Sequence, residues 1–217
     1  MDGFLTFALK YLPYLLSGAL VTAQITAGSF ALAMVFGLIG ALAKASGRKA
    51  ISFLASAYVE VIRGTPALLQ IFVVYYGLAS YGLSLSPIVA AVLTFGVIGG
   101  AYVTEIIRAG IEAVDRGQIE AATSLGMAPR TILQRIILPQ AAFLMLPPFT
   151  NFLISLVKDT SLALVVTVPE LMYRTYDVAS QTFRSMEIYA VAGAIYFAIC
   201  FPLSRFAKYL ERKRAPR

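Results

Sequence analysis

Long runs of apolar residues, separated by short polar connections, dominate the pattern of the chain. Five runs are long enough for a membrane helix, which needs about 20 mostly apolar residues to cross the hydrocarbon core. They are expected at roughly Tyr14–Ala43, Ile51–Tyr81, Pro87–Ile107, Ala141–Val168 and Tyr189–Phe206. A helix satisfies its own backbone hydrogen bonds, whereas an open strand in lipid does not. The pattern therefore predicts an all-α integral membrane protein with five transmembrane helices.

The second run is longer than one crossing requires, and the sequence RGTP interrupts it. Glycine and proline break helices, so we expect a broken helix here. Glu60 and Arg63 lie three residues apart, on one helical face, just before the break. One interpretation is a mutually neutralising pair that supports a kink. The other is a broken helix that lines a translocation path, with Arg63 binding a substrate carboxylate.

The fourth run also carries polar residues at membrane depth, in the sequence VKDTSL. Lys158 and Asp159 are adjacent, so on a helix they point about 100° apart and are poorly placed to satisfy each other. Charged groups within a membrane usually face a cavity or a partner. Thr160 and Ser161 could hydrogen-bond a zwitterionic substrate or only the preceding turn of backbone. These four residues are therefore candidates for the substrate path.

A polar stretch from Glu120 to Pro139, EAATSLGMAPRTILQRIILP, interrupts the apolar pattern between the third and fourth runs. Asp115 is expected to N-cap a short helix, and Gly126 to take the left-handed conformation that ends it. Pro129 suits the first turn of a second helix, which Pro139 is expected to close. The stretch thus predicts helix, sharp turn, helix. By physics alone, a connector lying on the lipid headgroups is the favoured interpretation of this stretch.

Lys and Arg residues gather in alternate connections, and this asymmetry predicts the orientation. The basic groups follow the first run, the third run and the fifth run: Lys44, Arg48 and Lys49; Arg108, Arg116, Arg130 and Arg135; Arg205, Lys208, Arg212, Lys213, Arg214 and Arg217. Five crossings place all three groups on one side of the membrane. We therefore expect the N-terminus outside, the C-terminus in the cytoplasm and the polar stretch in the cytoplasm. The charged connection before the fifth run is then external, and is either simply solvated or part of a protein dock.

Composition agrees with a membrane protein and excludes several classes of function. Of the 217 residues 59% are hydrophobic and 13% charged, with a mean hydropathy of +0.79, far from the values of a soluble domain. The net charge of +7 lies in connections rather than on one face, which argues against nucleic-acid binding. With no histidine and a single Cys200, the chain lacks the usual zinc and haem ligands and any Ser-His-Asp triad. No metal site is expected, and the absence of histidine and the scatter of carboxylates weigh against the alternative of a membrane-embedded enzyme. The acidic start without a basic region is a poor signal peptide, so we expect the N-terminus to be retained.

Spacing within the polar stretch resembles a known pattern. Glu120, Ala121 and Ala122 are followed by Gly126 and by an Ile-x-Leu-Pro that ends at Pro139. This is similar to the EAA loop of permease subunits in binding-protein-dependent ABC importers, with every fixed position present. The stretches VIRGTPALLQIFVVYYG, EIIRAGI and LVKDTSLALVVTVPEL resemble the branch that imports polar amino acids. The resemblance covers nearly the whole chain.

The resemblance implies one permease domain over residues 1–217, with a coupling loop at about 112–139 that docks on a cytoplasmic ATPase. The residues implied in coupling are Glu120, Ala121, Ala122, Gly126 and Pro139. It also implies several partners in the inner membrane of a prokaryote: an ABC ATPase dimer that carries ATP and Mg, a second permease copy or paralogue, an extracytoplasmic substrate-binding protein, an amino-acid substrate and membrane lipid. The chain itself has no phosphate-binding loop for ATP. A secondary transporter driven by an ion gradient is the alternative, although the five unequal runs show no convincing internal repeat.

Overall fold

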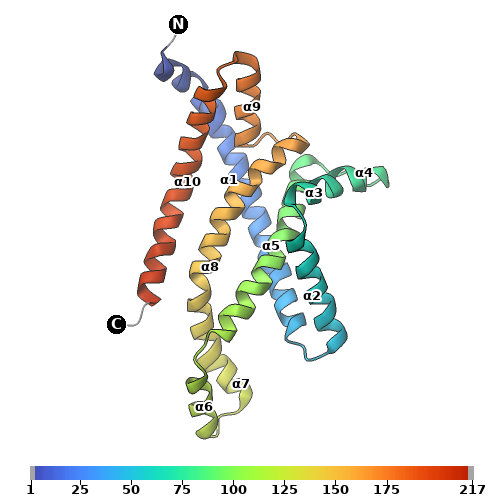
Figure 1. Ribbon diagram of the computed structural model, residues 1–217, viewed down its shortest axis with the longest axis vertical. Coiled ribbons are helices and arrows are strands. Elements are labelled where there is room, and N and C mark those ends of the chain that lie inside the picture. The colour runs from blue at the N-terminus through green and yellow to red at the C-terminus, as the bar shows by residue number, and fades with distance from the viewer. Residues whose placement is uncertain (1–2, 215–217) are drawn as a thin grey trace.

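The computed structural model describes residues 3–214, which form helices joined by short connections and contain no strand (Figure 1). Helix α1 (Phe4–Lys44) runs from the upper end of the molecule to the α1–α2 connection and packs beside α5 (Pro87–Glu112). Two glycines of α1 make this pairing close. A Cβ on Gly37 would lie 2.1 Å from Val103 Cγ1, and one on Gly40 would lie 2.2 Å from Thr104 Oγ1. Only glycine permits the two backbones to approach this closely.

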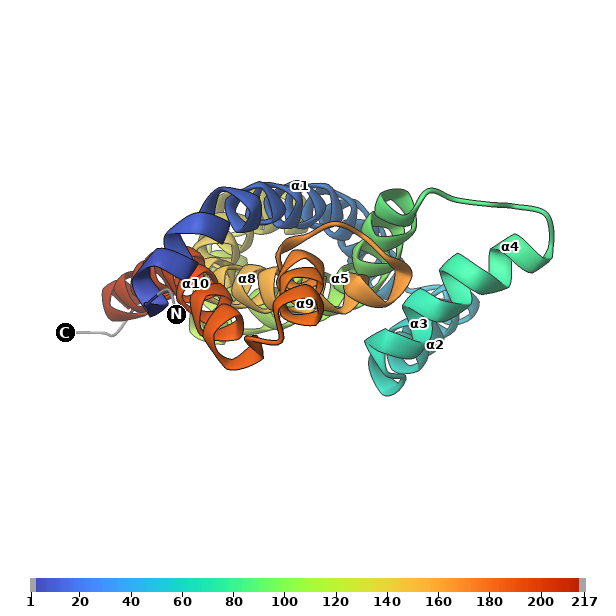
Figure 2. The same cartoon turned by 90° about the horizontal axis from the view of Figure 1, so that it is seen from above.

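The second apolar run is broken, as predicted. Helix α2 (Lys49–Gly64) ends before Thr65 and Pro66, and the chain resumes in α3 (Ala67–Phe72), a π-helical turn η1 (Val73–Gly77) and the short α4 (Leu78–Ser80). The two parts are bent by 104°. Figure 2 shows α3 and α4 extending away from the other helices. The described chain thus holds four helices long and apolar enough to cross a membrane, or five if this bent pair is one span.

The polar stretch forms the predicted helix, turn and helix. Asp115 caps α6 (Arg116–Ser124) by accepting a hydrogen bond from the Gln118 backbone N–H at 3.3 Å. Gly126 takes a φ of +74° in the turn, and Pro129 starts α7 (Pro129–Ile132). The prediction that Pro139 closes this second helix is wrong.

Helix α7 instead continues through a π-helical turn, η2 (Leu133–Ile137), into α8 (Leu138–Asp159). Proline removes the donor to the carbonyl four residues earlier, which normally stops a helix. Here the wider π-helical turn lies directly before Pro139 and takes up that irregularity. The chain then tightens into a 3₁₀ segment, η3 (Thr160–Val166), which ends at Thr167 with a left-handed φ of 60°.

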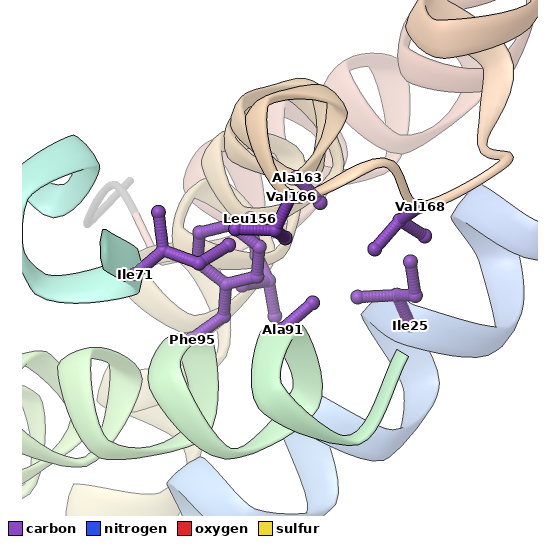
Figure 3. Packing of buried hydrophobic residues seen from close by; sticks show 8 residues of the cluster. All are labelled: Ile25, Ile71, Ala91, Phe95, Leu156, Ala163, Val166 and Val168. Carbon is purple, nitrogen blue, oxygen red and sulfur yellow. The ribbon is translucent and has the colours of Figure 1, made fainter. Parts of the chain in front are cut away.

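The last two helices are α9 (Leu171–Thr182) and α10 (Ser185–Arg214). A hydrophobic core lies where α1, α3, α5, α8 and η3 meet (Figure 3). Phe95 of α5 lies in this core and is only 1% exposed. The other members of this core are Ile25, Ile71, Ala91, Leu156, Ala163, Val166 and Val168.

Candidate functional site

Two adjoining hollows lie between α5 and α8, and we refer to them together as the groove. The first has a volume of about 440 Å³ and the second of about 400 Å³. Tyr102, Ile106 and Pro148 line both hollows, so the two are continuous along the helices. Much of the remaining lining is apolar. The few polar side chains in the groove are therefore the ones that decide what it holds.

Asp159, the last residue of α8, lines the first hollow together with Asn151 and Ser155. Successive spacings of four residues place these three polar side chains on one face of the helix. Of the described residues that line this hollow, only Asp159 is charged. The facing residues of α5, such as Phe95 and Tyr102, offer it no opposite charge.

Arg63 and Glu105 line the second hollow from α2 and α5. The Arg63 guanidinium carbon lies 5.3 Å from the centroid of the Tyr102 ring, which is cation–π distance. Within the described chain, Arg63 and Glu60 form no ion pair, so the interpretation as a mutually neutralising pair does not describe this structure. Glu105 is held by Lys44 at 2.6 Å and by Arg108 at 3.0 Å.

The other predicted path residues lie outside the groove. Glu60 and Lys158 are exposed elsewhere, and Ser161 is half-buried without lining either hollow. Thr160 is buried and donates its hydroxyl to the Val157 carbonyl at 2.8 Å, the backbone bond that was one of its two expected roles. Among the described residues, no cluster of three or more His, Cys, Asp or Glu side chains could hold a metal ion.

Several groove residues were missed from the sequence. Asn151 and Ser155 share the helical face of Asp159, a spacing that could have identified them. Glu105 lies in EIIRAGI, which entered the argument only as part of a resemblance. Pro148 is a third case. It has no N–H to donate to the carbonyl of Leu144, so this part of α8 offers irregular backbone beside the second hollow.

In the loop formed by α6, α7 and their connection, some of the predicted coupling residues are exposed and others are buried. Glu120 and Ala121 are exposed, and the turn at Gly126 is exposed as well. Ala122 differs from the expectation that it faces a partner, because it is 2% exposed and packs inside this chain. Leu125, beside the turn, is 82% exposed and was not singled out from the sequence. A large apolar residue within a polar loop is the sequence signal that could have identified Leu125.

The charged connection before α10 is structured rather than simply solvated. The Glu170 carboxylate is fully buried and accepts hydrogen bonds from the Tyr173 N–H at 2.7 Å, the Met172 N–H at 2.9 Å and the Tyr196 hydroxyl at 3.1 Å. Burial raises the pKa of Glu170, and these hydrogen bonds oppose the shift. Because Thr22 of α1 donates to the same carboxylate at 3.3 Å, the cap of α9 also binds α1 and α10 together.

Comparisons with known proteins cover both the groove and the loop. A family model described as binding-protein-dependent transport system inner membrane component matches residues 33–216. The L-cystine transport system permease protein TcyB of Bacillus subtilis (strain 168) is 40% identical over 205 residues, which cover 94% of this chain and 88% of that protein. The probable glutamine ABC transporter permease protein GlnP of the same organism is 36% identical over 214 residues, with coverages of 97% and 98%. The crystal structure of an amino acid ABC transporter with histidines matches with a TM-score of 0.93 at 38% identity, over 98% of this chain and 99% of that chain.

Proposed function

The chain belongs to the family of binding-protein-dependent transport system inner membrane components, and from this premise we propose that the groove between α5 and α8 is its path for a polar amino acid. The chain is a membrane permease subunit of an amino acid ABC importer. In these systems a separate ATPase subunit hydrolyses ATP, so the chain is not itself an enzyme. The observation that carries the proposal is that Asp159 and Arg63, from different helices, line adjoining hollows.

The chemistry of the groove suits a zwitterion. A carboxylate is favoured beside Arg63, whose guanidinium can bind two oxygens at once, and an ammonium group beside Asp159. The Tyr102 ring and apolar side chains lie between the two charges and offer contact to the apolar part of an amino acid. Irregular backbone at membrane depth occurs where it lines such a cavity. Glu60, Lys158, Thr160 and Ser161 would then act around the path rather than in contact with the amino acid.

We propose that the loop formed by α6, α7 and their connection binds the ATPase partner. Glu120 and Ala121 face outward near the exposed turn at Gly126, and Leu125 offers an apolar anchor for a groove on the partner. Ala122 and Pro139 contribute from within, by packing α6 and by joining the loop to α8. ATP and Mg would bind the ATPase dimer alone.

We infer the orientation from charge and architecture together. Figure 1 shows the α1–α2 connection, α6, α7 and the described end of α10 toward one end of the molecule, with α9 toward the other. The basic connections thus share the end that carries the loop, which supports a cytoplasmic loop and C-terminus in a prokaryotic inner membrane. The opposite end, including α9, would meet the substrate-binding protein.

Copurification tests the coupling assignment. The tagged chain, its Glu120→Lys variant and a Glu211→Lys control are purified in mild detergent, and the associated proteins are identified. Glu211 is an exposed acid near the end of α10, so the control reverses the same charge at the same end of the molecule. We expect the wild type and the control to retain an ABC ATPase and Glu120→Lys to lose it. Retention by all three would contradict the assignment, and uptake that persists without ATP would favour an ion-driven transporter.

A further inference from the structure

A third hollow, of about 410 Å³, lies between α1, α2 and α5, apart from the groove. We call it the α1–α2 cleft. Its lining consists of apolar side chains and one tyrosine: Phe36, Ile39, Gly40, Ala43, Ile51, Leu54, Ala55, Tyr58 and Val97. The Tyr58 hydroxyl is already engaged, since it donates to the Val97 carbonyl at 2.5 Å. The cleft therefore offers an occupant apolar contact and no free side-chain hydrogen-bonding group.

Large apolar side chains at the edge of the α1–α2 cleft remain uncovered. Ile39 is 59% exposed and Leu54 is 68% exposed. The cleft is thus open sideways, in the direction in which lipid chains lie around a membrane helix. An amino acid or another small polar solute would lose hydrogen bonds with water on entering it and regain none.

Two basic residues lie at one end of the α1–α2 cleft. Arg48 and Lys49 lie three and two residues before Ile51 in the chain, and both are exposed. Among the described residues, neither belongs to an ion pair, whereas the neighbouring Lys44 is occupied by Glu105 at 2.6 Å. An apolar slot with two unpaired positive charges at its mouth complements a molecule that joins an apolar chain to a negative head.

We propose that the α1–α2 cleft binds one acyl chain of an anionic phospholipid, whose phosphate headgroup contacts Arg48 and Lys49. The proposal uses the inferred orientation, in which this end of the cleft meets the cytoplasmic leaflet, and it does not depend on what the groove transports. Basic pockets between membrane helices on the cytoplasmic side bind the headgroups of anionic lipids. The acyl chain and the phosphate headgroup of the lipid would bind at separate places, so each contact can be tested alone.

Native mass spectrometry of the detergent-purified full-length chain with its associated subunits tests the proposal. Phosphatidylglycerol and phosphatidylcholine with identical acyl chains are added, and the retained lipid is counted. The wild type is expected to retain phosphatidylglycerol preferentially. Arg48→Gln combined with Lys49→Gln should weaken that retention by roughly 30-fold, about a factor of five for each basic residue.

Matched controls separate the cleft from general effects of charge and hydrophobicity. Lys208→Gln combined with Arg212→Gln removes two exposed charges from α10 and should leave retention unchanged. Leu54→Gln should lower retention of both lipids, whereas Phe53→Gln on the same helix should not, because Phe53 is exposed but does not line the cleft.

Three outcomes would overturn the proposal. The first is equal retention of the two lipids by the wild type, and the second is an equal loss in the α10 control. The third concerns a second copy of the chain as the occupant. In a Cys200→Ser background, efficient disulfide formation between two Leu54→Cys chains would show that protein rather than lipid covers the cleft. Transport activity is not used in any of these measurements, so failure here would leave the proposed path unaffected.

Discussion

At the scale of single residues, an exposed carboxylate and a buried one differ in their partners. Asp159 faces a hollow in which no other described residue is charged. Glu170 is enclosed by donors from three helices. A carboxylate that lacks partners is available to a ligand, whereas one surrounded by donors is part of the structure. We therefore expect Asp159 to act in the proposed path and Glu170 to stabilise the end of the molecule that carries α9.

Replacing Asp159 with Asn tests the path. The variant keeps the shape of the side chain and removes its charge, so we expect uptake of the amino acid to fall about 10- to 100-fold, the range for one charged hydrogen bond. Uptake into vesicles with the full importer is the measurement. The control Glu211→Gln removes an exposed carboxylate outside the groove and should transport normally. Unchanged uptake by Asp159→Asn would exclude this residue from the path.

Glu170 gives the chain a pH-dependent stability with a defined sign. Burial raises the pKa of this carboxyl above its ordinary value of 4.5, so the folded chain binds the proton more tightly than the unfolded one. The stabilisation is therefore fully present below 4.5 and is lost as pH rises through the folded pKa. We expect the unfolding temperature of the wild type to fall over that range, and the fall to be smaller in Glu170→Gln. Thermal unfolding in detergent checks this, and Glu211→Gln should keep the wild-type slope.

At the scale of elements, most helices could be predicted from the chain, and the departures have physical causes. Hydrophobic runs gave every long helix, and turn chemistry located α6 and α7 through Asp115, Gly126 and Pro129. Pro139 failed as a stop signal because a π-helical turn precedes it, and π turns have no simple sequence signature. Helix α9 was missed because its mixed charges resemble a solvated loop. Its cap at Glu170 is satisfied by Thr22 and Tyr196, which are far away in sequence.

Because α1 and α5 pack so closely, replacing a glycine of α1 at their contact with a larger residue should lower the free energy of unfolding. A leucine at position 37 would overlap Val103, since even a Cβ there lies 2.1 Å from its Cγ1. We expect Gly37→Leu to destabilise the chain by at least about 1–3 kcal/mol, the usual cost of overpacking. Gly193→Leu is the control, because nothing lies within 4 Å of a Cβ at that glycine of α10. Equal unfolding temperatures for the two variants would contradict the packing described for α1.

The turn between α6 and α7 predicts a coupling defect that differs from a loss of stability. Gly126 and Gly82 both have positive φ, +74° and +85°, with nothing within 4 Å of an added Cβ. Alanine costs about 1–2 kcal/mol in this conformation at either position. We expect similar losses of stability in Gly126→Ala and Gly82→Ala, but reduced substrate-stimulated ATP hydrolysis only in Gly126→Ala. If Gly82→Ala impaired hydrolysis equally, the effect would lie in stability rather than in the loop.

At the scale of the whole molecule, the arm formed by α3, η1 and α4 extends away from the other helices (Figure 2). The arm carries large apolar side chains that are wholly or partly exposed: Leu68, Leu69, Phe72, Val73 and Tyr76. Within a membrane such a surface is covered by lipid or by another chain, and this chain belongs to a family of transport-system components. The sequence RGTP predicted the break in this segment. The outward direction of the arm depends on the 104° bend, which the composition of the run does not encode.

We therefore expect a second permease chain to pack against the arm. In a Cys200→Ser background, Leu69→Cys should form intermolecular disulfides in the membrane, because Leu69 is 52% exposed on the arm. Phe197→Cys, 65% exposed on α10 away from the arm, is the control and should remain monomeric. Cross-linking by the control alone would place the second copy on the opposite face.

The continuous helix from α7 to α8 has a mechanical consequence. From Pro129 to Asp159 the chain forms one rod of about 45 Å, at roughly 1.5 Å per residue. One end of this rod belongs to the loop assigned to the ATPase, and the other carries the carboxylate assigned to the amino acid. A tilt imposed at the loop would reach Asp159 directly, as in a lever, with no chain of intermediate contacts to relay it. The π-helical turn and the Pro147–Pro148 pair interrupt its regular hydrogen bonding, so we expect the rod to bend there and any bending to reduce the tilt that reaches Asp159.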